Sequence, residues 1–82
     1  MTEREILSRL TGILRDILSD DSIVLTMETR REEVPNWDSF VYINFIVAVE
    51  LQFKVKFGVA EVESFQNVGA IVQKIEALLP AA

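Results

Sequence analysis

The fold is decided by residues 35–53, which read PNWDSFVYINFIVAVELQF. Pro35 and Asn36 break regular structure, and the following Asp38 is a good N-cap whose charge suits the positive end of a helix dipole. From Ser39 to about residue 52 there is no breaker. β-branched and aromatic residues alone would favour a strand, but about fifteen unbroken residues exceed the usual strand length. The stretch therefore predicts a helix.

This helix carries apolar residues on two faces. The first stripe is formed by Tyr42, Phe45, Ile46, Val49 and Phe53, and the second, displaced around the helix, by Phe40, Ile43 and Val47. A helix that is apolar nearly all round is normally buried on all sides, but a chain of 82 residues has too little material to surround one. We therefore expect the first stripe to pack inward and the second to face a partner or ligand.

The residues before this helix predict another helix and a long connection. Thr2 and Glu5 fit a capping box, and apolar positions then repeat at helical spacing as far as Leu18. The arginines of this first helix, including Arg15, lie outside the apolar stripe and are expected to face water. Residues 19–38 form a connection whose apolar side chains hold it over the core, and connections of this length are often functional.

The residues after the central helix predict two shorter elements. Residues 54–58 indicate a turn, and residues 59–65 a short helix with Val62 and Phe65 toward the core. Asn67 caps a last helix that Pro80 ends. Its apolar face is formed by Val68, Ile71, Val72, Ile75, Leu78 and Leu79. With no repeat or second domain, residues 1–82 are expected to form one all-α domain, a small four-helix bundle of three main helices and one short helix.

Composition excludes several functions. Thirteen acidic and eight basic residues give a net charge of −5, the wrong sign for gripping nucleic acid or an anionic membrane. The absence of Cys and His excludes disulfides, thiolate nucleophiles, Cys/His zinc sites and imidazole catalysis. No apolar run is long enough to span a bilayer, and the first residues are not a basic signal-peptide region. We expect a cytoplasmic protein without nucleic-acid, membrane or metal ligands.

Few residues remain that could carry chemistry. The adjacent acids at 20–21 and 32–33 are typical of solvated loops. Neither a Gly-rich phosphate loop nor a motif for a Ser–Lys hydrolase, with Lys54, Lys56 or Lys74 as base, is present. Ser39 is different, because it stands where a long connection becomes a helix. Asp38 and Ser39 can simply begin that helix. Equally, a phosphate attached to Ser39 would be stabilised by free N–H groups and the helix dipole.

The tripeptide Asp38-Ser39-Phe40 resembles the Asp-Ser-Leu motif of acyl carrier proteins, small acidic helical bundles. Trp37 before it is similar to the Trp-Asp-Ser form of many stand-alone carriers. As in that family, the motif follows a long loop and opens a helix that ends near a Phe, here Phe53. A short helix and an apolar last helix follow, so the resemblance covers essentially the whole chain.

The resemblance implies a carrier and not an enzyme. Ser39 would bear 4′-phosphopantetheine, attached from coenzyme A by a phosphopantetheinyl transferase, with Asp38 helping to position the divalent metal and pyrophosphate. The thiol of the arm would hold acyl groups for acyl-activating or acyl-transferring enzymes of fatty acid, polyketide or related metabolism. The chain itself is expected to be a monomer.

Family analogy also assigns the two stripes. Phe40, Ile43 and Val47 would dock partner enzymes. The inward residues would shelter an acyl chain or simply form the core; they are Tyr42, Phe45, Ile46, Val49, Phe53, Val62, Phe65, Val68 and Ile71.

The chain departs from the family pattern in ways that keep alternatives open. Phe40 replaces Leu, and Val41 and Asn44 stand where fatty-acid carriers place acids, so that Glu50 is the acid left on this helix. Docking to basic patches should weaken, and apolar contact should matter more. Bulky aromatic residues such as Tyr42 are expected to leave little room for a long chain. The alternatives are an unmodified helical interaction domain and a peptidyl or D-alanyl carrier, although peptidyl carriers usually show Gly-Gly before the motif.

Overall fold

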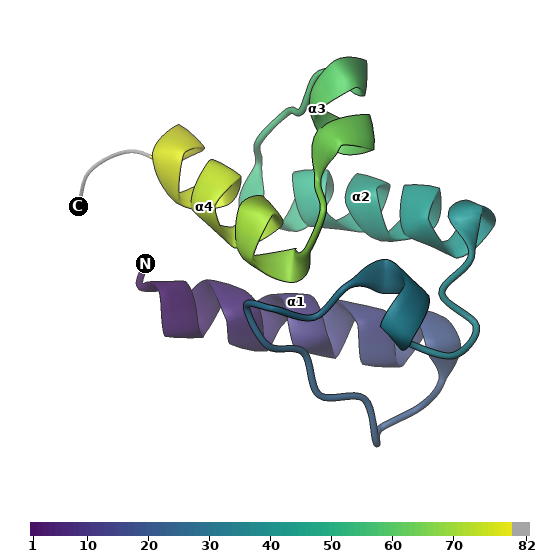
Figure 1. Ribbon diagram of the computed structural model, residues 1–82. Helices are drawn as coiled ribbons and strands as arrows, with labels where there is room; N and C mark the ends of the chain where they lie inside the picture. The colour runs from purple at the N-terminus through teal and green to yellow at the C-terminus, as the bar shows by residue number, and fades with distance from the viewer. Residues whose placement is uncertain (80–82) are drawn as a thin grey trace.

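A computed structural model describes residues 1–79 of the chain (Figure 1). Its elements, in chain order, are α1 (Glu3–Leu18), the short 3₁₀ helix η1 (Arg31–Glu33), α2 (Ser39–Phe53), α3 (Val59–Ser64) and α4 (Val68–Leu78). The described residues contain no strand. The predicted all-α class, with three main helices and one short one, is confirmed. The η1 turn was not predicted, and the stop expected at Pro80 lies outside the described residues.

Helix α1 begins with the predicted capping box. The Glu5 N–H donates to Thr2 Oγ1 over 3.2 Å, and the Thr2 N–H donates to Glu5 Oε1 over 3.2 Å. These bonds favour the ionised carboxylate, so they lower the pKa of Glu5. The expectation that Arg15 faces water is wrong, because Arg15 Nε donates to the Ile23 carbonyl over 2.7 Å. Its guanidinium therefore ties the following connection to α1.

The connection of residues 19–38 lies across α1 before it reaches α2 (Figure 1). Ile23 and Leu25 are buried in the core, as the sequence predicted. The Gly69 N–H donates to the Met27 carbonyl over 2.8 Å, fixing the connection on the first turn of α4. A Cβ at position 69 would lie 2.6 Å from the Met27 oxygen, so this close approach requires glycine.

One core lies between α1, α2 and α4. Its fully buried side chains include Ile6, Leu10, Leu14, Phe45, Val49, Val68, Val72 and Ile75. The expectation that Leu78 belongs to this core is wrong, since Leu78 is 40% exposed in the last turn of α4. Conversely, Phe57 lies in the predicted turn but is buried, with its ring edge-on to Phe65 at 5.4 Å between centroids. The hydrophobic effect pulls this turn onto the bundle and holds α3 near α2.

Candidate functional site

Ser39 is the first residue of α2 and is exposed. Asp38 precedes it in an extended conformation, and its Oδ1 accepts a hydrogen bond from the Val41 N–H over 2.9 Å. Asp38 is therefore the N-cap that the sequence predicted. The cap fixes the first turn of α2 and with it the position of the Ser39 hydroxyl on the surface.

Trp37, immediately before the cap, is buried with only 5% of its surface exposed. Its ring packs edge-on against Phe45 at 5.2 Å and at a tilt against Tyr42 at 6.3 Å between centroids. Its Nε1 is buried and has no hydrogen-bond partner among the described residues. An unpaired buried donor costs about 1–3 kcal/mol. The burial of Nε1–H therefore does not stabilise the fold.

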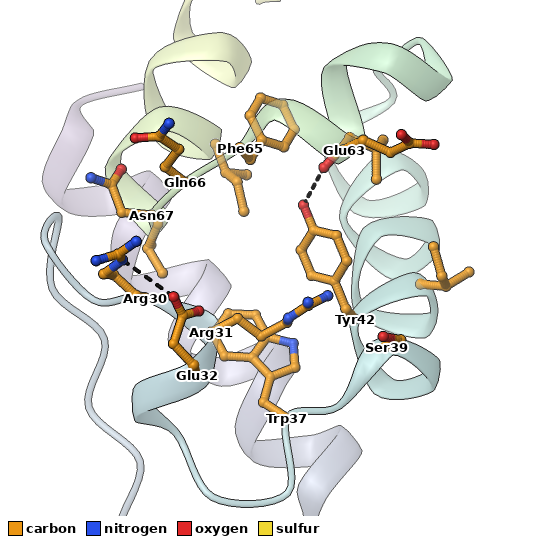
Figure 2. Close-up of a pocket in the computed structure, with 14 residues that line it drawn as sticks. Arg30, Arg31, Glu32, Trp37, Ser39, Tyr42, Glu63, Phe65, Gln66 and Asn67 are labelled. Atoms are coloured by element: carbon orange, nitrogen blue, oxygen red, sulfur yellow. Dashed lines mark hydrogen bonds and ion pairs between the residues drawn. The ribbon is translucent and has the colours of Figure 1, made fainter.

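A cavity of about 380 Å³ opens beside Ser39, and we call it the Ser39 cavity (Figure 2). This volume lies within the range of small-molecule sites. The cavity is bounded by α2, α3, the start of α4 and the η1 segment. Its lining residues are Arg30, Arg31, Glu32, Trp37, Ser39, Tyr42, Ile43, Val62, Glu63, Phe65, Gln66, Asn67, Val68 and Ile71.

Tyr42 forms one wall of the Ser39 cavity. Its hydroxyl donates to the Val62 carbonyl over 2.7 Å, which joins α2 to α3. Burial raises the pKa of Tyr42, and the nearby Arg31 charge opposes that shift. Tyr42, Val62 and Phe65, which were expected to face inward, are half-buried, pack against the core and border the cavity. The remaining inward residues of α2, among them Phe45 and Val49, are buried.

The guanidinium of Arg31 lies over the ring of Tyr42, with Cζ 4.8 Å from the ring centroid. Figure 2 shows the Arg31 side chain extending between Trp37 and Tyr42. Sequence reasoning missed this residue, because Arg31 belongs to no motif and to no periodic pattern. Only the fold of the connection brings it to the cavity.

The outer face of α2 is apolar and exposed. Phe40 is 77%, Ile43 54% and Val47 48% exposed, and these are the residues predicted to be offered to a partner. The structure adds Leu51, which is 74% exposed. Leu51 follows Val47 by four residues, about one helical turn, so the spacing alone could have placed it on the same face. We call these four residues the outer face of α2.

The single acid expected on this helix is not free for docking. Glu50 is half-buried, and its Oε2 accepts a hydrogen bond from the Phe57 N–H over 2.9 Å. Glu50 therefore holds the turn after α2. Apolar side chains are what this face presents.

Other candidate chemistry finds little support. Within residues 1–79, no group of three or more acidic side chains is placed to hold a metal ion. None of the helices described is both long and apolar enough to cross a membrane. Lys74, considered as a base, forms an ion pair with Glu61, and this contact helps to lower the pKa of Glu61.

Comparison with known proteins identifies the class. No family model and no curated protein matches the chain. Among solved structures, the chain is similar to the solution NMR structure of a holo acyl carrier protein from Geobacter metallireducens. The two are 39% identical with a TM-score of 0.81, over 88% of this chain and 83% of that one. The helical bundle thus has the fold of a carrier protein.

At this identity and coverage, the chain belongs to the acyl carrier protein family, as the resemblance of its motif predicted. Its role is that of a carrier and not a catalyst.

Proposed function

We propose that Ser39 carries 4′-phosphopantetheine and that the chain delivers acyl thioesters on this arm to partner enzymes of fatty acid, polyketide or related metabolism. The observation that carries the proposal is the exposed Ser39 hydroxyl, fixed by the Asp38 cap at the first turn of α2 and bordering a cavity. The similar structure from Geobacter metallireducens is of a holo protein.

The residues present fit such an arm. A phosphodiester on Ser39 would lie at the positive end of the α2 dipole, near backbone N–H groups of its first turn. The chain has no Cys, so a carrier of thioesters needs a thiol from outside, which the arm supplies. The Ser39 cavity offers an apolar wall, formed in part by Val62 and Ile71, beside the attachment point.

The outer face of α2 is the proposed docking surface for the phosphopantetheinyl transferase and the acyl-transferring enzymes. Phe40, Ile43 and Val47 lie within about two helical turns of Ser39, so an enzyme that reaches the arm would cover them. Because Glu50 is engaged with the Phe57 N–H, recognition relies on apolar contact more than on charge. Asp38 keeps one carboxylate oxygen beyond the bond to Val41 and is proposed to orient the metal during arm transfer.

Arm addition tests the proposal directly. The purified unmodified protein is incubated with coenzyme A, magnesium and a broad-specificity transferase, and its intact mass is measured. We expect one phosphopantetheine per chain, and none in Ser39→Ala. Ser8→Ala, which removes another exposed serine on α1, is the matched control and should be modified like the wild type.

Two outcomes would overturn the proposal. Failure of the wild type to gain mass, with a transferase active on a control carrier, would favour an unmodified interaction domain. Addition that persists in Ser39→Ala would move the attachment site elsewhere. Mass spectrometry of the protein from its native cell would then identify the cargo, with an aminoacyl group indicating a peptidyl or D-alanyl carrier.

A further inference from the structure

The Ser39 cavity has an uneven lining. One part is apolar, with Val62, Phe65 and Ile71, as suits a hydrocarbon chain. The part formed by η1 and the residues just before α2 instead contains Arg31 and the ring of Trp37, whose buried Nε1 is unpaired. A cavity meant only for an alkyl chain needs neither group, because burying a polar donor without a partner is unfavourable.

The charges around the cavity leave Arg31 without a carboxylate. Glu32 pairs with Arg30, with Nε and Oε1 3.3 Å apart, so this acid is already occupied. Glu63 points away from the cavity in Figure 2. Among the described residues, Arg31 takes part in no ion pair, and its contact is with the face of the Tyr42 ring. Such a contact leaves the in-plane N–H groups of a guanidinium available to an anion.

Trp37 supplies a second donor on the same side. Its ring and the Arg31 guanidinium both contact Tyr42, with centroids 6.3 Å apart for the rings and Cζ 4.8 Å from the Tyr42 centroid for the arginine. Nε1 is buried in this structure, so a ligand reaches it only when side chains around it move, and the Arg31 side chain lies between Trp37 and Tyr42 in Figure 2. Arg31 is half-buried and belongs to a one-turn segment, and rotation of its side chain requires no change in the helices.

We propose that the Ser39 cavity selects acyl groups that end in a carboxylate, with Arg31 and the Trp37 Nε1–H as the donors to its two oxygens. The apolar wall at Val62 and Ile71 contacts the methylene chain between the thioester and this carboxylate. The inference names the class of cargo for the proposed carrier function and rests on it. A plain alkyl group would leave Nε1 unpaired, whereas a carboxylate satisfies both donors.

The first test does not require the arm. The unmodified chain is titrated with adipamate, which has a carboxylate at one end and an amide in place of the thioester at the other, and with hexanamide, which lacks the carboxylate. Binding is followed by the backbone amide signals of Val62 and Phe65 and the indole signal of the single tryptophan. We expect Kd for adipamate to be at least about tenfold lower than for hexanamide.

Variants assign the donors. Arg31→Gln should reduce the preference to within about twofold, whereas Arg9→Gln, which removes an exposed charge from α1, should preserve it. Trp37→Phe should lower the preference partly, because it removes Nε1–H and keeps an aromatic ring. Equal affinities for the two ligands in the wild type would overturn the proposal. So would a preference that survives Arg31→Gln, or one that is lost in Arg30→Gln instead.

The second test uses the carrier with its arm. Chains loaded with hexanoyl or adipoyl phosphopantetheine are compared with the holo chain by the Trp37 indole signal. We expect adipoyl to move this signal and hexanoyl to leave it near its holo position. A signal that moves fully on addition of the arm would show that the donors hold the phosphodiester, and equal movement by both acyl groups would show no selection; either overturns the inference. A chain that accepts no arm contradicts the proposed function, while the titration above still decides the cavity.

Discussion

Helices α1 and α2 have almost the same length, 16 and 15 residues, yet their solvent-facing sides differ completely. The outer side of α1 is polar, with Arg4, Ser8 and Arg9 exposed, whereas the outer face of α2 is apolar. Both helices bury an apolar stripe in the same core. Folding requires only the buried stripe of each helix. It therefore accounts for the whole surface of α1 but not for the apolar outer face of α2.

The apolar outer face of α2 is close in sequence to the buried, unpaired Nε1 of Trp37. The outer face starts at Phe40, one residue after Ser39, and Trp37 lies two residues before Ser39. Exposed apolar side chains and a buried unpaired donor are both unfavourable in the isolated chain. Their concentration around one hydroxyl is what indicates that this region works through contacts made with other molecules.

The largest expected effect compares the same substitution on the two kinds of surface. Leu10 in α1 is fully buried, and Leu10→Ala should lower the free energy of unfolding by about 2–5 kcal/mol through lost burial and a cavity. Leu51 on the outer face of α2 is 74% exposed, and Leu51→Ala should change it by less than about 0.5 kcal/mol. Urea unfolding followed by circular dichroism measures both. A loss above about 2 kcal/mol in Leu51→Ala would mean that the outer face contributes to the fold after all.

The next effect concerns recognition. Ile43→Asp places a charge in the outer face of α2 and should reduce kcat/KM for arm addition by about tenfold, because an apolar contact with the enzyme is replaced by a desolvated charge. Ser8→Asp adds the same charge to the outer side of α1 and should stay within about twofold. Both variants should unfold within about 0.5 kcal/mol of the wild type. Equal kcat/KM values for Ile43→Asp and Ser8→Asp would show that the outer face of α2 is not the docking surface.

Local signals in the sequence were sufficient to predict where these two helices begin. Thr2 and Asp38 are caps whose side chains act within three residues, so the beginnings of α1 and α2 could be predicted, and the Asp-Ser motif located Ser39. The contacts of Arg15 with Ile23 and of Arg31 with Tyr42 could not be predicted, because each joins a helix to the connection of residues 19–38, which has no periodic pattern. The unpaired Nε1 of Trp37 depends on how several side chains pack around one atom, which no pattern encodes.

A smaller effect distinguishes the hydrogen bond of the Asp38 cap from the charge of its carboxylate. Asp38→Ala removes the bond to the Val41 N–H and should cost about 1 kcal/mol, whereas Asp38→Asn keeps a good N-cap and should cost a few tenths. If the carboxylate also orients the metal during arm transfer, both variants should be modified about tenfold more slowly. Intact-mass time courses and urea unfolding measure the two properties. Normal modification of Asp38→Asn would leave Asp38 with the cap alone.

The smallest effect concerns the cap of α1, which differs from that of α2 in its third residue. Glu5 completes the capping box of α1, whereas α2 has Val41 at the same position. The Thr2 backbone N–H, and then its hydroxyl, hold the pKa of Glu5 below its ordinary value of 4.5. The charge of Glu5 therefore stabilises the fold above pH 4.5, and this contribution is lost as the pH falls through the lowered folded-state value.

Glu5→Gln keeps an oxygen acceptor but no charge, so it isolates this contribution. The wild type should be more stable than Glu5→Gln at pH 7, and the difference should shrink as the pH falls below 4.5, as measured by urea unfolding at low salt. The same difference at both pH values would show that Glu5 acts through its hydrogen bonds alone. The beginning of α1 would then depend, as predicted for Asp38→Asn in α2, on an oxygen acceptor at the cap and not on its charge.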